Sequence, residues 1–211
     1  MTTQGEKETT RIEAFSDGVF AIAVTLLILE VKVPRNLPPD QLLAALAHQW
    51  PAWLAFLSSF LSIGIMWLNH HRLFTLIHRC DEPLLFYNLL LLLAITIVPF
   101  PTALLAEYIR GPGSRVAGLL YTIHGMIIAV CYTLLWRHAA TGNRLLGPRI
   151  SHDLAHAIFK QYRFGPLLSL GCVGLSLVSP YAAVGVMVAL TLFFAVRPAA
   201  LRCALDEELA T

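Results

Sequence analysis

One apolar segment near the start of the chain restricts the possible folds more than any other feature. From Gly18 to Leu29 every residue except Thr25 is small or apolar, whichever side of a helix it would occupy. A helix that is apolar on all sides must be surrounded by lipid or by protein. With its flanking residues the predicted helix covers 12–33, which is long enough to cross the core of a bilayer. We therefore expect a membrane-spanning helix here.

The composition of the whole chain agrees with a membrane protein. Of its 211 residues, 57% are hydrophobic and only 13% are charged, whereas charged residues make up about a quarter of soluble domains. The formal net charge of +2 gives no reason to expect a nucleic-acid partner. The polar start, MTTQGEKETT, and the length of the first apolar run argue against a cleaved secretory signal. We expect an all-α integral membrane protein with a single domain over residues 1–211.

Six membrane-spanning helices are predicted. Four apolar segments are clear, and a longer apolar block over 164–196 is divided by Ser179-Pro180, where we expect a tight turn. A re-entrant hairpin over 164–179 is the alternative for the first part of this block. The predicted spans cover residues 12–33, 50–70, 83–107, 115–136, 164–179 and 180–196.

Prolines and glycines mark two further irregularities. Pro99 and Pro101 are expected to kink or end the third helix, because proline lacks the N–H that a helix interior requires. Gly111-Pro112-Gly113 is typical of a turn, and we place it between the third and fourth spans.

The long polar connection over 138–162 is expected to contain a short helix. Ser151 can cap this helix, which we predict over 151–162 and place at the membrane surface. His152 and His156 have a spacing that can chelate zinc, but no third ligand lies nearby in the sequence. No metal site is therefore predicted.

Lysine and arginine residues indicate how the chain is oriented. With six spans, eleven of them fall on the side that holds both termini and four on the other side. An excess of these residues marks the cytoplasmic side. We therefore expect both termini in the cytoplasm.

One stripe of the first helix is a candidate pore lining. Ile22, Thr25, Leu26 and Leu29 follow the i, i+3, i+4, i+7 spacing and fall on one side of the helix. Such a stripe either packs against a neighbouring helix or lines a narrow pore. Asp17 projects from nearly the opposite side, and we expect it to point into the protein.

Polar residues at the cytoplasmic ends of three helices are expected to meet. Because an ionisable group inside a span is costly, each one is a functional candidate. These groups either form a network that changes state when a pore opens, or a polar cluster that fixes helix packing. The residues are Asp17 in the first span, Trp67, Asn69, His70 and His71 in the second, and Asn88 in the third.

The same residues resemble the signature of a known family. Arg11-x-x-x-Phe15-Ser16-Asp17 leads into the first span, and Trp67-Leu68-Asn69-His70-His71, Asn88 and Pro99-Phe100-Pro101 follow further along the chain. This pattern is similar to that of the transmembrane protein 175 family of potassium channels, in its bacterial form with one six-helix unit per chain.

The resemblance implies a homotetramer in the bacterial inner membrane whose first helices line the pore. Ile22 would form the narrow apolar ring, with Leu26 and Leu29 as further rings and Thr25 as the residue that affects selectivity. The sequence lacks a TVGYG loop, so no cage of backbone carbonyls is expected. The implied function is a cation channel with a weak preference for potassium over sodium. Its partners would be potassium ions and membrane lipid, with no cofactor.

A proton-coupled secondary transporter is the alternative, with Asp17 and the membrane-embedded histidines as its relay. Carriers often contain two related halves and helices broken near the midplane, and neither is evident in the sequence. An enzyme is not expected, because the sequence has no GxSxG, HExxH or phosphate-binding glycine loop. The four cysteines are scattered without a CxxC spacing.

Overall fold

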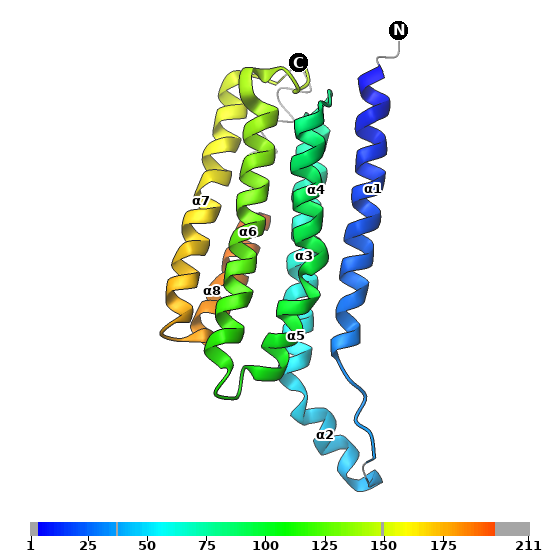
Figure 1. Ribbon diagram of the computed structural model, residues 1–211, viewed down its shortest axis with the longest axis vertical. Helices are drawn as coiled ribbons and strands as arrows, with labels where there is room; N and C mark the ends of the chain where they lie inside the picture. The colour runs from blue at the N-terminus through cyan, green and yellow to red at the C-terminus, as the bar shows by residue number, and fades with distance from the viewer. Residues whose placement is uncertain (1–3, 37, 149, 197–211) are drawn as a thin grey trace.

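The structure, a computed structural model, describes residues 4–36, 38–148 and 150–196. These residues form a bundle of helices (Figure 1). The α-helices are α1 (Gln4–Leu26), α2 (Leu42–His48), α3 (Trp50–Leu76), α4 (Glu82–Ile97), α5 (Pro99–Tyr108), α6 (Ser114–Ala140), α7 (His152–Ser176) and α8 (Pro180–Val196). Three short 3-10 turns accompany them, namely η1 (Leu27–Glu30), η2 (Pro39–Gln41) and η3 (Thr141–Asn143).

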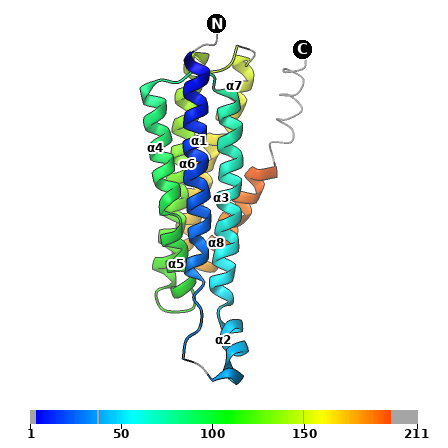
Figure 2. The ribbon, with the colours of Figure 1, turned by 90° about the vertical axis from the view of Figure 1, so that its right-hand side faces the viewer.

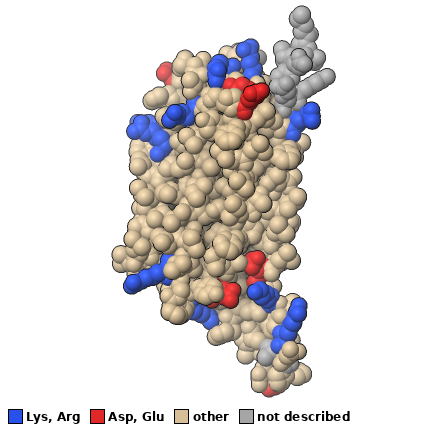
Figure 3. Space-filling model, in the orientation of Figure 1, with Lys and Arg blue, Asp and Glu red and all other residues tan. Residues whose placement is uncertain are grey.

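The long helices lie side by side along one direction, as two perpendicular views show (Figures 1 and 2). Within the bundle, α6 packs against α4, α5, α7 and α8, whereas α1 packs against α3 and α4. The visible charged side chains gather at the two ends and leave an uncharged band between them (Figure 3).

The long helices have the length and composition of membrane spans. In the described part of the chain four segments qualify: Thr9–Glu30, Trp50–Leu76, Glu82–Tyr108 and Ser114–Asn143. The segment Pro180–Ala195 is apolar but shorter. The prediction of an all-α membrane protein is therefore confirmed.

The helix breaks follow the prolines and glycines. The third predicted span is divided into α4 and α5 immediately before Pro99. The Gly111-Pro112-Gly113 turn lies between α5 and α6, and α8 begins at Pro180. Each break falls where a backbone N–H is missing or where glycine permits a tight turn.

The region around residues 151–162 differs from the prediction. Ser151 caps a helix as expected, with its Oγ accepting a hydrogen bond from the N–H of Leu154 (3.1 Å). This helix does not end near residue 162 but continues as α7 to Ser176, so the predicted interfacial helix and fifth span are one element. The reason is that Leu154 and Ile158 are buried in the core of the bundle instead of facing lipid headgroups.

Asp81 holds α4 and α6 together at one end of the bundle. One of its carboxylate oxygens accepts the N–H of Leu84 (3.0 Å) and caps α4. The carboxylate also accepts hydrogen bonds from Nε2 of His138 (2.9 Å) and Nη2 of Arg144 (3.0 Å). Partial burial raises the pKa of Asp81, but the hydrogen bonds and the neighbouring charges outweigh it, so the pKa lies below its ordinary value.

Candidate functional site

Helix α1 has one face that packs into the bundle. Ser16, Phe20, Ala23 and Leu27 are all buried. They follow one another at intervals of four, three and four residues, which places them on one side of a helix. This face therefore contacts α3 and α4.

The other face of α1 is not covered by any described part of the chain. Ile22 exposes 61% of its surface, Leu29 exposes 67%, and Leu26 exposes 40%. Thr25 is exposed on the same side. The structure thus places all four residues of the predicted stripe on the outside of the subunit, where they can contact lipid or another subunit.

The end of the stripe is wound more tightly than predicted. The α-helical geometry ends at Leu26, and Leu27–Glu30 form a 3-10 turn. Because a 3-10 helix has three residues per turn, the stripe widens here, and Ile28 is exposed beside Leu29.

Thr25 presents an oxygen atom on the exposed face. Its hydroxyl group donates to the backbone carbonyl oxygens of Ala21 (3.0 Å) and Ile22 (2.9 Å). The hydroxyl proton is therefore directed back to the helix, and the lone pairs of Oγ1 remain on the outer side. This orientation suits an acceptor for a cation.

A buried hydrogen-bonded chain connects α1, α4 and α3. Nδ2 of Asn88 donates to Oγ of Ser16 (3.1 Å), and Ser16 donates to the backbone oxygen of Ile12 (2.8 Å). Nε2 of His70 lies 2.9 Å from Oδ1 of Asn88, and because this oxygen can only accept, His70 is the donor. Ser16, Asn88 and His70 are all buried. The chain thus satisfies polar groups that would otherwise be costly in an apolar core.

Asp17 is not part of this buried chain. It is exposed, and its Oδ1 accepts a hydrogen bond from Nε1 of Trp67 (2.8 Å). The ring of Trp67 in turn stacks on His71, with 6.1 Å between the ring centres. The prediction that Asp17 points into the protein is wrong, because consecutive residues differ by 100° around a helix and Ser16 occupies the inward position.

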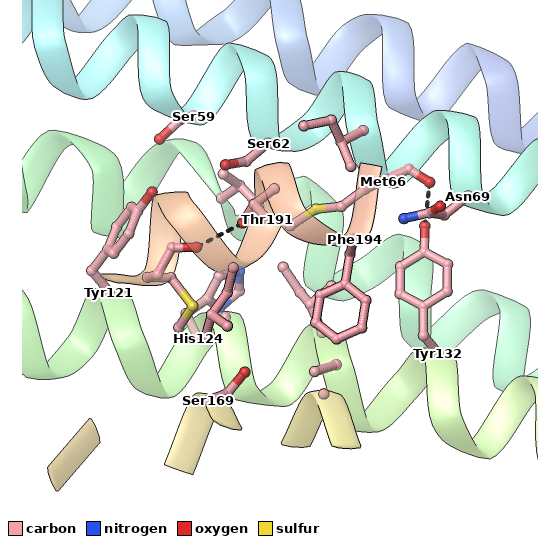
Figure 4. Close-up of a pocket in the computed structure, with 18 of the residues that line it drawn as sticks. Ser59, Ser62, Met66, Asn69, Tyr121, His124, Tyr132, Ser169, Thr191 and Phe194 are labelled. Carbon is pink, nitrogen blue, oxygen red and sulfur yellow. Dashed lines mark hydrogen bonds between the residues drawn. The ribbon is translucent and has the colours of Figure 1, made fainter. Parts of the chain in front are cut away.

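The other signature residues lie in different places. Arg11 and Phe15 are exposed on α1. Asn69 and His71 flank the buried His70 and point to opposite sides of α3. Asn69 therefore does not join Asp17, and it faces a cavity on the far side of α3 (Figure 4). The expected cluster is thus divided into a buried chain, an exposed pair and a separate cavity residue.

The sequence did not indicate this cavity, which has a volume of about 130 Å³ and lies among α3, α6, α7 and α8. Hydroxyl groups of Ser59, Ser62, Ser169 and Thr191 line it, together with Tyr121 and His124 (Figure 4). Nε2 of His124 donates to the backbone oxygen of Ala94 (2.9 Å). The sequence feature that could have indicated the cavity is the helical spacing of Ser59, Ser62, Met66 and Asn69, which all lie on one side of α3.

Metal or redox chemistry finds no site in the described residues. They contain no group of three or more His, Cys, Asp or Glu side chains arranged to hold a metal ion. The thiol of Cys80 donates to the backbone oxygen of Asp81 (3.6 Å), Cys131 and Cys172 form no disulfide among the described residues, and Cys203 lies outside these residues.

The fold and the site define a multi-pass, all-helical membrane protein whose first helix carries an uncovered apolar face. Residues 11–99 match the family described as endosomal/lysosomal potassium channel TMEM175. The chain is 50% identical over 194 residues to a protein of Chamaesiphon minutus named as a potassium channel. The matched region covers 91% of this chain and 96% of that protein. A potassium channel of Streptomyces collinus is 46% identical over 173 residues, or 82% of this chain and 84% of that protein.

A solved structure agrees with these relatives. The crystal structure of a lysosomal potassium-selective channel TMEM175 homolog from Chamaesiphon minutus superposes with a TM-score of 0.82 at 50% sequence identity. The superposition covers 90% of this chain and 98% of that one. The chain belongs to the TMEM175 family.

Loss of the buried chain should destabilise the protein more than loss of the exposed pair. We expect Asn88→Leu to cost about 2 to 4 kcal/mol, because it leaves Ser16 and His70 buried with unsatisfied polar groups. Trp67→Phe should cost less than about 1 kcal/mol, because Asp17 remains open to other partners. Size-exclusion chromatography of heated, detergent-solubilised samples measures the thermal stability of each variant. Equal loss of thermal stability in the two variants would contradict this account.

Proposed function

We propose that this protein is a potassium channel in which four subunits surround a central pore lined by α1. The observation that carries the proposal is the uncovered stripe of Ile22, Thr25, Leu26 and Leu29. Relatives named as potassium channels, and a homolog named as potassium-selective, support the choice of ion. In the tetramer, the uncovered face of each α1 would then lie against the α1 faces of the other subunits.

The ring of Ile22 side chains acts as the gate. Four branched apolar side chains around a narrow axis exclude water, and an ion stripped of water there has no partner. The closed state is thus maintained by dewetting. Opening widens the ring until a largely hydrated ion can pass, and Leu26 and Leu29 continue the apolar lining toward the outer side.

Selectivity then depends on width and on the Thr25 hydroxyls. Because the proton of each hydroxyl is bonded to the backbone of its own helix, four oxygen lone pairs face the ion. Such oxygens replace part of the hydration shell at lower cost for potassium than for sodium, which holds its water more tightly. The expected preference is modest, since no carbonyl cage surrounds the ion.

The proposed location is the bacterial inner membrane, with six spans and both termini in the cytoplasm. The excess of lysine and arginine on the side of the termini supports this orientation. The alternation of α1, α3, α4–α5, α6, α7 and α8 along the bundle supports six passes (Figures 1 and 2). We assign no cofactor and no catalytic residue.

The proton-coupled transporter is the weaker candidate. A relay needs titratable groups in contact, but Asp17 is bonded to Trp67, whereas His70 is bonded to Asn88. His124 donates to a backbone oxygen on another part of the bundle. Among the described residues, no hydrogen bond joins Asp17 to His70 or His124.

Purified protein in liposomes should carry an electrogenic potassium flux, and Ile22→Asn should increase it. The amide allows water into the constriction, and we expect the potassium flux to rise roughly tenfold or more. A tenfold rise requires the barrier to fall by only about 1.4 kcal/mol. Leu93→Asn is the matched control, because Leu93 on α4 is also apolar and 58% exposed but lies outside the stripe. If Ile22→Asn and Leu93→Asn have the same effect, α1 does not line the pore.

Removal of the Thr25 hydroxyl should reduce the discrimination between potassium and sodium. We expect Thr25→Val to lower the permeability ratio roughly two- to fivefold, which is the effect of about 0.5 to 1 kcal/mol. Thr25→Ser keeps the hydroxyl and should retain most of the ratio. Reversal potentials in planar bilayers give these values. A ratio unchanged in Thr25→Val would show that the hydroxyl does not contact the permeating ion.

A further inference from the structure

A second polar feature lies at the end of the bundle where α6 ends and α7 begins. A hollow of about 190 Å³ is present there, which is many times the space required by one water molecule. The residues that carry functional groups or an aromatic ring at this hollow are Arg137, Thr141, Asn143, His152, His156 and Phe159.

Hydrogen bonds hold the walls of this hollow in place. Nε1 of Trp136 on α6 donates to the backbone oxygen of Ala155 on α7 (3.2 Å). Nδ2 of Asn143 donates to the backbone oxygen of Ile150 (3.2 Å). Hydrogen bonds from α6 and η3 to the start of α7 therefore link the residues around the hollow.

The nitrogen-bearing side chains at the hollow have no partners in the described part of the chain. The side chains of Arg137, His152 and His156 make no hydrogen bond or ion pair with any described residue, whereas the neighbouring His138 and Arg144 both bind Asp81. The carboxylate of Asp81 thus binds His138 and Arg144 near the end of α6, whereas the positive charge of Arg137 is left without a carboxylate partner. Asp153, in the first turn of α7, does not line the hollow.

The charge at the hollow selects an anion over a metal ion. The guanidinium of Arg137 remains protonated in proteins and repels a divalent cation beside the two histidines. The same group donates several hydrogen bonds in a fixed plane that matches a phosphate. Each imidazole adds an N–H donor, and the N-terminus of α7 adds positive potential.

The position along α7 indicates that the anion comes from solution. The exposed apolar surface of α7 begins at Phe164 and continues through Leu167. His156 precedes Phe164 by about two helical turns, or about 12 Å, whereas the headgroup layer of each leaflet is about 5 to 7 Å thick. Lys160 and Arg163 lie between them along α7. The hollow, whose α7 residues Phe159 and His156 precede Phe164 by about 8 and 12 Å, therefore lies at or past the outer edge of a headgroup layer, which favours a phosphate from solution.

We propose that this hollow binds the phosphate group of a soluble phosphate compound, with Arg137, His152 and His156 as its donors. The site is separate from the α1 stripe, so it does not depend on the proposed channel function. No residue of the Ser16–Asn88–His70 chain contributes to it.

The test is binding of inorganic phosphate and glycerol phosphate to the full-length protein in phosphatidylcholine nanodiscs, measured by calorimetry at constant ionic strength. We expect Arg137→Gln to weaken binding roughly tenfold or more, because a hydrogen bond to a charged group is lost. Arg79→Gln is the matched control, because Arg79 is an exposed arginine at the same end but outside the hollow. Equal weakening in both variants would indicate general charge attraction and overturn the proposal.

A second measurement uses the unaltered protein and does not depend on how the variants fold. Bound phosphate should slow the modification of His152 and His156 by diethylpyrocarbonate at least severalfold, while His78 is unaffected. Mass spectrometry of the peptides distinguishes these histidines. Protection by phosphatidylglycerol but not by soluble phosphate would assign the site to lipid and overturn the soluble source. Protection by zinc alone would overturn the anion assignment.

Discussion

Three polar side chains buried among α1, α3 and α4 are hydrogen-bonded to one another across the helices. Ser16, Asn88 and His70 come from different helices, and an unpaired member would cost about 1 to 3 kcal/mol in the apolar core. Hydrophobic packing alone does not fix the rotation of α1, because the helix is apolar on all sides from Gly18 to Leu29. The hydrogen bonds among Ser16, Asn88 and His70 therefore fix how α1 is rotated in the bundle.

The rotation of α1 determines what each face can do. With Ser16 directed inward, Phe20 and Leu27 also face the core, and Ile22 and Leu29 must face away from it. The polar anchor and the candidate gate are thus opposite faces of one helix. In the proposed channel, a movement that widens the ring of Ile22 side chains either keeps the hydrogen bonds of Ser16, Asn88 and His70 or breaks them at a cost of about 1 to 3 kcal/mol for each unpaired group.

The sequence predicted the elements better than their contacts. Prolines and glycines located the breaks at Pro99, Gly111-Pro112-Gly113 and Pro180, because their effect on the backbone is local. Helical periodicity placed Ile22, Thr25, Leu26 and Leu29 on one side of the helix, but it did not decide whether that side packs against a neighbour or stays uncovered. The sequence could not show that Ser16, and not Asp17, faces the core. This one-residue difference in helix rotation depends on the hydrogen bond between Ser16 and Asn88, which is distant in sequence. The cavity near Asn69 and the single long α7 likewise depend on how several helices meet.

The central claim is that Ile22 of one subunit faces Ile22 of others across a shared axis. The most direct measurement is disulfide formation in the membrane by Ile22→Cys, with the four native cysteines replaced by serine. We expect Ile22→Cys to give covalent dimers on non-reducing gels under mild oxidation, and Leu93→Cys on α4 to give none. A protein that remains monomeric with Ile22→Cys, while Leu93→Cys forms the dimers, would contradict the claim.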